Sequence, residues 1–163
     1  MTTALPETSP LLVDTNMLVL FAVGRVNRGR IETFKRTRKF ASRDFDLLLR
    51  VLGRWRTGTL YTVPHVLAEV SNLTDLKGSE GPQIRQFLKE TISLLFEVKI
   101  PSVKAALDPT YTSLGLVDAA IAAVAREHKC TVLTDDLDLY LRLQRDAVSV
   151  VNFTHLQAQA FGL

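Results

Sequence analysis

Short apolar runs alternate with longer stretches of helical periodicity along this chain of 163 residues. Short runs rich in Val, Leu, Ile and Thr are typical of strands that are buried on both faces of a sheet. Strands that alternate with helices indicate βαβ units, in which neighbouring strands lie parallel. The pattern therefore predicts an α/β protein in which a central, mainly parallel five-stranded sheet lies between two layers of helices, as a three-layer α/β/α sandwich.

The expected elements follow from the positions of these runs. We expect strands near residues 10–14, 59–63, 96–100, 130–134 and 148–151, and helices near 16–24, 31–56, 64–75, 82–95, 115–129 and 136–145, with a short helix after Phe153. No internal repeat or low-complexity linker divides the chain, and its hydrophobic content of 47% can fill one core. We therefore expect one domain over residues 1–163.

Four carboxylates stand where apolar segments end or begin. They are Asp14 in LLVDTN, Glu69 in VPHVLAEV, Asp118 in LGLVDAAIAAVA and Asp136 in VLTDDLDL. An unpaired buried charge costs several kcal/mol, so carboxylates on apolar segments need compensation. In an open parallel sheet the carboxyl ends of the strands form one edge, and ligands bind in the crevice there. We therefore expect the four acids to converge at that edge around a shared divalent cation.

Each acid taken alone has a simpler interpretation. Asp14 can cap the helix that follows it, and Thr134 or Asp135 can cap a helix that begins after the last apolar run. Asp118 can be a first-turn acid that interacts with the helix dipole, and a single helical residue such as Glu69 is most often solvated. These interpretations leave the arrangement unexplained, because three of the four acids occur at strand-to-helix turns or helix starts.

The segments LLVDTNMLV, VPHVLAEV, GLVDAAIAAVA and VLTDDLDL, in this order, resemble the motifs of the PIN-domain nucleases, a family that includes the VapC-type toxins. The resemblance covers essentially the whole chain and is closest over residues 11–21, 60–73 and 114–140. It implies that four acids form the catalytic site: Asp14, Glu69, Asp118 and Asp136. Three of them, Asp14, Asp118 and Asp136, are the implied metal ligands.

The same resemblance implies supporting roles for Asn16, for Thr134 and, more weakly, for Asp138. Asp135 occupies a variable position of the motif, and we do not expect it to be a ligand. The 54 residues between Asp14 and Glu69 form a longer segment than in compact VapC-type toxins. This departure leaves the subfamily and the substrate open.

Hydrolysis of RNA phosphodiesters by a metal-dependent endoribonuclease is the function that these features favour. Mg²⁺ or Mn²⁺ matches a site with only oxygen ligands and can lower the pKa of a bound water. The resemblance implies products with 5′-phosphate and 3′-hydroxyl ends, and it includes toxins of toxin–antitoxin pairs, so an antitoxin or a second copy of the chain is a candidate partner. The alternative is a catalytically silent PIN-like module whose role is to bind a partner.

Basic residues are concentrated in one stretch. Residues 24–56 contain eleven Lys or Arg against three acids, a net charge of +8 in a chain whose total is +3. We predict a basic helical segment here with one apolar face, and an opposite face that contacts an RNA backbone through Arg36, Lys39 and Arg43. A solvated amphipathic helix, a helix pair broken near Ser42, and a face that docks a partner or a second copy remain open.

The remaining features narrow the class of protein. Cys130 is the only cysteine, so it forms no intrachain disulfide, and a buried thiol is expected. The three histidines show no metal-ligand pairing, which argues against structural zinc. Residues 1–10 lack the basic start and apolar stretch of a secretory signal, and the apolar run 11–23 is interrupted by Asp14 and Asn16. We therefore expect a cytoplasmic enzyme without a membrane segment.

Overall fold

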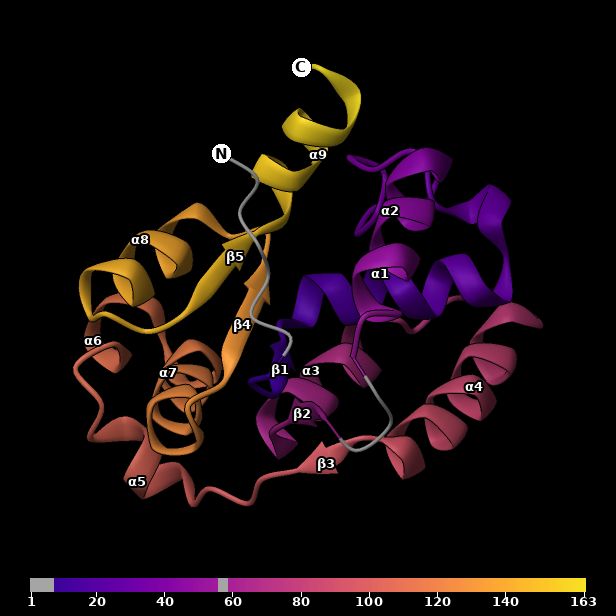
Figure 1. The fold of residues 1–163 in the computed structure, drawn as a ribbon. Helices are drawn as coiled ribbons and strands as arrows, with labels where there is room; N and C mark the ends of the chain where they lie inside the picture. The colour runs from indigo at the N-terminus through magenta and orange to yellow at the C-terminus, as the bar shows by residue number, and fades with distance from the viewer. Residues whose placement is uncertain (1–7, 56–58) are drawn as a thin grey trace.

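The computed structural model describes residues 8–55 and 59–163, which form a five-stranded sheet with helices on both sides (Figure 1). The strands are β1 (Leu11–Val13), β2 (Leu60–Thr62), β3 (Phe96–Glu97), β4 (Thr131–Thr134) and β5 (Val150–Asn152). Their order in the sheet is β3-β2-β1-β4-β5, and every neighbouring pair is parallel. The predicted α/β class and the five-stranded parallel sheet are confirmed.

The helices are α1 (Thr15–Val26), α2 (Ser42–Leu52), α3 (Pro64–Leu73), α4 (Glu80–Leu94), α5 (Ser102–Ala106), α6 (Tyr111–Leu114), α7 (Leu116–His128), α8 (Leu137–Arg145) and α9 (Phe153–Phe161). Figure 1 shows α1, α2 and α4 on one side of the sheet and α5 to α8 on the other, while α9 returns to contact α2. The sequence analysis did not predict α5 and α6. Helices of four or five residues are too short to produce a recognisable apolar period.

Strands β1 and β4 are buried along their whole length, because helices cover both faces of the sheet centre. After β1 the chain continues to β2 on one side, and after β4 it continues to β5 on the other side. The two strands are paired in register up to Val13 and Leu133, so the residues that follow them lie side by side. A crevice at the carboxyl edge of an open α/β sheet forms where the connections diverge in this way.

The basic helical segment predicted over residues 24–56 is wrong in its central part. Helix α1 ends at Val26, a 3₁₀ turn follows at Arg28–Arg30, and residues 31–40 form a run of turns. In the remainder of the predicted segment only α2 is α-helical, and residue 56 lies outside the described residues. The break that we considered near Ser42 is therefore the point where the helix begins.

The physical reason for the turns is a three-residue repeat. The buried side chains of this stretch occur at every third position: Ile31, Phe34, Thr37 and Phe40. A period of three fits a tighter backbone than the 3.6 residues per turn of an α-helix. The Thr37 hydroxyl also donates a hydrogen bond to the Ile31 carbonyl at 2.8 Å, which closes the turn from inside. We name residues 31–40 the turn segment.

Helix α2 packs closely against α1, which anchors the chain after the turn segment. A Cβ atom built on Gly24 would lie 2.4 Å from Cδ2 of Phe45, so only glycine permits this approach of the two helices. Beyond this contact, buried apolar side chains from both helix layers and the sheet form one cluster. Cys130 belongs to it, and burial raises the pKa of its thiol to about 11. In the described part of the chain no helix is both long and apolar enough to span a membrane.

Candidate active site

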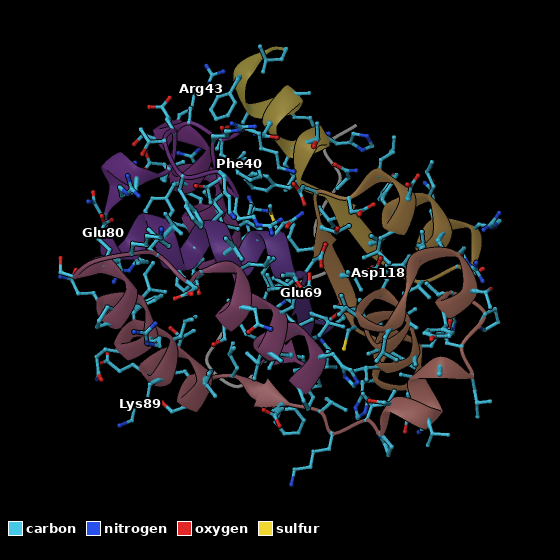
Figure 2. All side chains as sticks on the ribbon, turned by 180° about the vertical axis from the view of Figure 1, so that it is seen from behind. Phe40, Arg43, Glu69, Glu80, Lys89 and Asp118 are labelled. Atoms are coloured by element: carbon cyan, nitrogen blue, oxygen red, sulfur yellow. The ribbon has the colours of Figure 1, made fainter. Side chains whose placement is uncertain are left out.

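The four predicted acids line one cavity at the carboxyl edge of the sheet. The cavity has a volume of about 330 Å³, and its lining comprises Asp14, Thr15, Asn16, Glu69, Leu114, Leu116, Val117, Asp118 and Asp136. Figure 2 shows Glu69 and Asp118 near the centre of the molecule, where α3 and α7 are in contact. Asp14 and Asp136 enter from the ends of β1 and β4. The structure therefore brings together side chains that span most of the chain.

Asp14 is the most enclosed of the four carboxylates. It follows β1 and caps α1, and Oδ1 accepts a hydrogen bond from the Thr15 backbone N–H at 2.6 Å. Oδ2 accepts a hydrogen bond from the Thr134 hydroxyl, also at 2.6 Å. Burial raises the pKa of Asp14 to about 6, with further repulsion from Asp135 and Asp136, although the two hydrogen bonds oppose the shift. These two hydrogen bonds thus hold a carboxylate whose charge has no cationic partner among the described residues.

Asp136 caps α8 in the same way that Asp14 caps α1. Its Oδ1 accepts hydrogen bonds from the backbone N–H groups of Asp138 and Leu139, at 2.8 and 3.0 Å. Its own N–H donates to the Thr134 hydroxyl at 3.0 Å, so one threonine connects Asp136 to Asp14. Asp136 therefore both caps α8 and lines the cavity. Asp138 is exposed in the first turn of α8 and does not line the cavity.

Asp118 and Glu69 complete the acidic lining from the two helix layers. Asp118 lies in the first turn of α7, just after Gly115, which has a φ of 93° that favours glycine. Burial raises the pKa of Asp118 to about 7, and repulsion from Asp14, Asp136 and Glu69 adds to the shift. Burial also raises the pKa of Glu69, whereas the nearby Arg36 guanidinium lowers it. The four carboxylates are thus electrostatically coupled.

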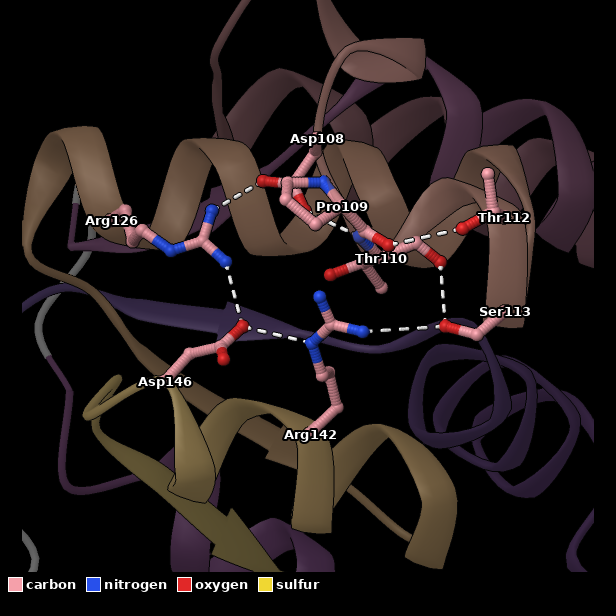
Figure 3. Close-up of polar contacts among 8 residues, drawn as sticks. All are labelled: Asp108, Pro109, Thr110, Thr112, Ser113, Arg126, Arg142 and Asp146. Atoms are coloured by element: carbon pink, nitrogen blue, oxygen red, sulfur yellow. Dashed lines mark hydrogen bonds and ion pairs between the residues drawn. The ribbon is translucent and has the colours of Figure 1, made fainter.

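A network of charged side chains connects the C-terminal ends of α7 and α8 (Figure 3). The Arg126 guanidinium on α7 bridges Asp108 and Asp146, with 3.0 Å to the latter. Arg142 on α8 contacts the same Asp146 at 3.0 Å and donates to the Ser113 hydroxyl at 3.4 Å. The sequence analysis missed this network, because Asp108 and Arg126 are 18 positions apart and only the fold makes them neighbours.

The predicted RNA-binding residues have unlike environments. The Arg43 guanidinium lies 4.4 Å from the centre of the Phe161 ring, where it helps to pack α2 on α9. Figure 2 shows Arg43 at the upper edge of the molecule, away from Glu69 and Asp118 near its centre. Arg36 is exposed on the turn segment, close enough to Glu69 to influence its pKa. The three residues therefore do not form one surface.

The third predicted RNA-binding residue, Lys39, faces Asp135. Its Nζ lies 2.5 Å from Asp135 Oδ2 as an ion pair, in an orientation that does not make a hydrogen bond. Asn16 donates from Nδ2 to Asp135 Oδ1 at 3.1 Å, so this amide supports Asp135 directly. Asp135 is not among the residues that line the cavity.

The chemistry of this lining fits a hard divalent cation. All of the side chains that can coordinate an ion there carry oxygen or amide donors, and the buried Thr15 hydroxyl has no hydrogen-bond partner within residues 8–55 and 59–163. Across those same residues, no three His, Cys, Asp or Glu side chains form a closed set of direct ligands. Mg²⁺ and Mn²⁺ commonly retain several waters and need few protein ligands. The cavity has room for one such ion together with its waters.

Comparison with known proteins agrees with this geometry. The model of the PIN domain family matches residues 11–146, so the chain belongs to the PIN domain family. The matched range includes all four acids of the cavity. A search of curated proteins gives no significant match. Proteins with PIN domains are generally nucleases, and they usually use divalent metal ions.

Proposed function

We propose that this protein is a metal-dependent endoribonuclease that hydrolyses RNA phosphodiesters at the acidic cavity. The observation that supports this most strongly is the convergence of four carboxylates from four distant segments on one cavity, with raised pKa values at Asp14, Glu69 and Asp118. A fold tolerates such uncompensated charge where function requires it. The family match supports the same reaction class.

The four acids have distinct proposed roles. Asp14, Asp118 and Asp136 would hold Mg²⁺ or Mn²⁺, in part through waters of the ion, and the ion would supply a water of lowered pKa and neutralise charge on the phosphate. Thr134 and the Thr15 N–H fix the Asp14 carboxylate, which limits its rotation before substrate arrives. The Glu69 carboxylate, whose pKa is raised by burial, accepts a proton from the attacking water.

The test is cleavage of a fluorescent single-stranded RNA in the presence of Mg²⁺ or Mn²⁺. The wild type should cut it to products with 5′-phosphate and 3′-hydroxyl ends, whereas Asp118→Asn should lose at least ~100-fold in rate, because a ligand matters at least as much as its supporting partners. Glu90→Gln, on the exposed surface of α4, is the matched control. Cleavage by Asp118→Asn at the wild-type rate would refute the proposal.

Substrate class is tested with a DNA strand of the same sequence. We propose a preference for RNA, which predicts faster cleavage of the ribose strand under identical conditions. Equal rates would make the protein a general single-strand nuclease. Absence of cleavage with either strand, at saturating metal, would favour the silent partner-binding module instead.

The narrower proposal is that the protein acts as the toxin of a toxin–antitoxin pair. It is supported by the resemblance of the four motifs to VapC-type toxins. Induced expression of the wild type in a bacterial host should then arrest growth, and expression of Asp118→Asn should not. Coexpression of an adjacent small gene should relieve the arrest and yield a complex on size-exclusion chromatography, whereas a homodimer would show as twice the mass of the chain alone.

A further inference from the structure

The turn segment presents its charged side chains in rows, because the chain repeats every three residues there. Residues three positions apart share a side in such a backbone. The preceding Arg30, together with Arg36 and Lys39, occupies one row. Lys35 and Arg38 occupy another row, offset by one position, and both are exposed. We name the first set the inner row and the second set the outer row.

Two of the three cations of the inner row form ion pairs with acids on different elements. Arg30 Nε lies 3.2 Å from Glu80 Oε2 at the start of α4. Lys39 Nζ lies 2.5 Å from Asp135 Oδ2, between β4 and α8. Arg36 therefore lies between two residues of the inner row that are held by ion pairs.

Arg36 differs from its two neighbours in the inner row. It is exposed, and among the described residues no carboxylate lies within ion-pair distance of it, yet its charge lowers the pKa of Glu69, which lines the acidic cavity. A guanidinium in this position keeps its five N–H donors available and can bind a phosphate through two of them. Because Arg36 lies three positions before Lys39, which pairs with the residue next to Asp136, Arg36 is an available cation near a cavity whose own lining is acidic.

Lys39 differs in the opposite way, because its partner is a buried carboxylate. The side chain of Asp135 is only 2% exposed, and its Oδ1 is already occupied by the Asn16 amide. Removal of Lys39 would leave a buried charge that only an amide supports. The contact therefore attaches the far end of the turn segment to the residue next to Asp136. Lys39 is exposed by 57%, but its charge is engaged inside the protein.

We propose that Arg36 binds a backbone phosphate of a single-stranded nucleic acid beside the acidic cavity, and that the Lys39–Asp135 ion pair is the positioning contact that holds Arg36 there. This revises the prediction that Lys39 itself contacts RNA. It rests on the proposed nuclease function for the identity of the bound polymer. A phosphate bound by Arg36 lies next to Glu69, which directs the strand toward the carboxylates.

The first test measures binding without catalysis. A fluorescein-labelled strand of 15 uridines is titrated with protein in EDTA, at several salt concentrations, and anisotropy gives the affinity. Arg36→Gln should weaken binding several-fold at low salt and reduce the slope of log K against log salt by about 0.7, as expected for one lost phosphate contact to a single strand. Lys35→Gln removes an adjacent exposed cation of the outer row and should change affinity less than twofold. Equal losses in the two variants would overturn the role of Arg36.

The second test uses the sign of a charge effect. Asp135→Asn removes a negative charge and releases Lys39, so a purely electrostatic surface would bind the uridine strand more tightly. A positioning role predicts the opposite, a loss of about threefold or more, because the turn segment is no longer held. Tighter binding by Asp135→Asn would overturn the proposal.

The third test separates positioning by Lys39 from direct contact. Lys39→Met should weaken binding in the wild-type background and have no further effect in Asp135→Asn, because both changes break one contact. A further loss and a lower salt slope in the double variant would show that Lys39 binds phosphate directly, which would overturn the proposal. Lys39→Arg keeps the ion pair and should therefore bind the strand as tightly as the wild type. This comparison with Lys39→Met can be made even if Asp135→Asn proves too unstable to purify.

These tests are independent of the catalytic proposal. Binding in EDTA requires neither metal nor cleavage, and Mn²⁺ affinity measured by calorimetry should be unchanged in Arg36→Gln. If the wild type binds the strand but does not cleave RNA, only the nuclease function is contradicted. Intact strand binding by Arg36→Gln, in an enzyme that cleaves RNA, would count against this inference alone.

Discussion

Two groups of acidic residues lie at opposite ends of α7 and α8, and their electrostatics are opposite. In the network of Figure 3, burial alone would raise the pKa of Asp108, but hydrogen bonds led by that from Arg126 lower it, and Arg142 lowers the pKa of Asp146. In the cavity, burial raises the pKa of Asp14 to about 6 and that of Asp118 to about 7. The first group is neutralised by the protein itself, and the second is not.

This difference shows how a structural acid can be told from a functional one. Both groups contain carboxylates that the chain takes out of water, so burial does not distinguish them. A fixed guanidinium completes the network, whereas the cavity lining, within the described part of the chain, has four acids and no cationic side chain. The cavity therefore has the charge balance of a site that recruits a mobile cation, and the network has that of a structural brace.

The largest expected effect is on metal binding by Asp14→Asn. Asparagine remains a good helix cap, so the change removes the charge and keeps the local backbone. Mn²⁺ affinity, measured by calorimetry, should fall by at least ~100-fold, because loss of a supporting partner alone costs 10–100-fold in typical metal sites. Asp75→Asn, at an acid that is outside the cavity lining and whose side chain is 80% exposed, serves as the control. Equal affinity in wild type and Asp14→Asn would remove Asp14 as a ligand.

The network should respond in stability rather than in metal binding. Arg126→Met leaves Asp108 buried without its cation, and we expect a loss of about 3 kcal/mol in the free energy of unfolding at pH 7, toward the lower end for buried pairs because Arg126 is partly exposed. Urea denaturation measures this. Since the pKa of Asp108 is lowered, this stabilisation is present above its ordinary value of 3.8 and should be lost as the pH falls below it. A fall in Mn²⁺ affinity as large as the loss of stability would place the network within the site.

Asp118→Asn should stabilise the metal-free protein. Because the pKa of Asp118 is raised from 3.8 to about 7, the wild type loses stability as the pH rises through this interval, and the variant does not. At pH 8 in EDTA we expect the variant to be more stable by about 2 kcal/mol, with a discount for partial solvation, and the difference should vanish near pH 4. Differential scanning calorimetry at the two pH values measures it. A lower melting temperature for the variant at pH 8 would mean that Asp118 has a stabilising protein partner.

The smallest expected effect concerns the threonine between the two helix caps. Thr134→Val keeps the shape of a fully buried side chain but removes the hydrogen bonds to Asp14 and Asp136. We expect Mn²⁺ affinity to fall about tenfold, in the range for a lost supporting group. Thr131→Val, a buried threonine at the start of the same strand, is the matched control. Unchanged Mn²⁺ affinity in Thr134→Val would mean that Asp14 and Asp136 keep their positions without the Thr134 hydroxyl.

Local patterns determined much of this protein before any contact was known. The apolar runs before Asp14 and Asp136 are strands β1 and β4, because short runs of β-branched and aliphatic residues suit a doubly covered sheet. The placement of four acids beside such runs also anticipated the cavity, since parallel strands end at one edge. The turn segment was harder to predict, because its three-residue burial repeat can also be interpreted as one side of an α-helix.

Only the tertiary structure decided which charges are compensated. Arg36, Lys39 and Arg43 are similar residues in one basic stretch, but one is available beside the cavity, one is engaged by Asp135, and one packs on Phe161. The partners of Lys39 and Arg43 lie about a hundred positions away in the chain, and ion pairs and ring contacts act over a few ångströms. Local sequence determines what a side chain can do, and the fold determines which groups come close enough for it to act on.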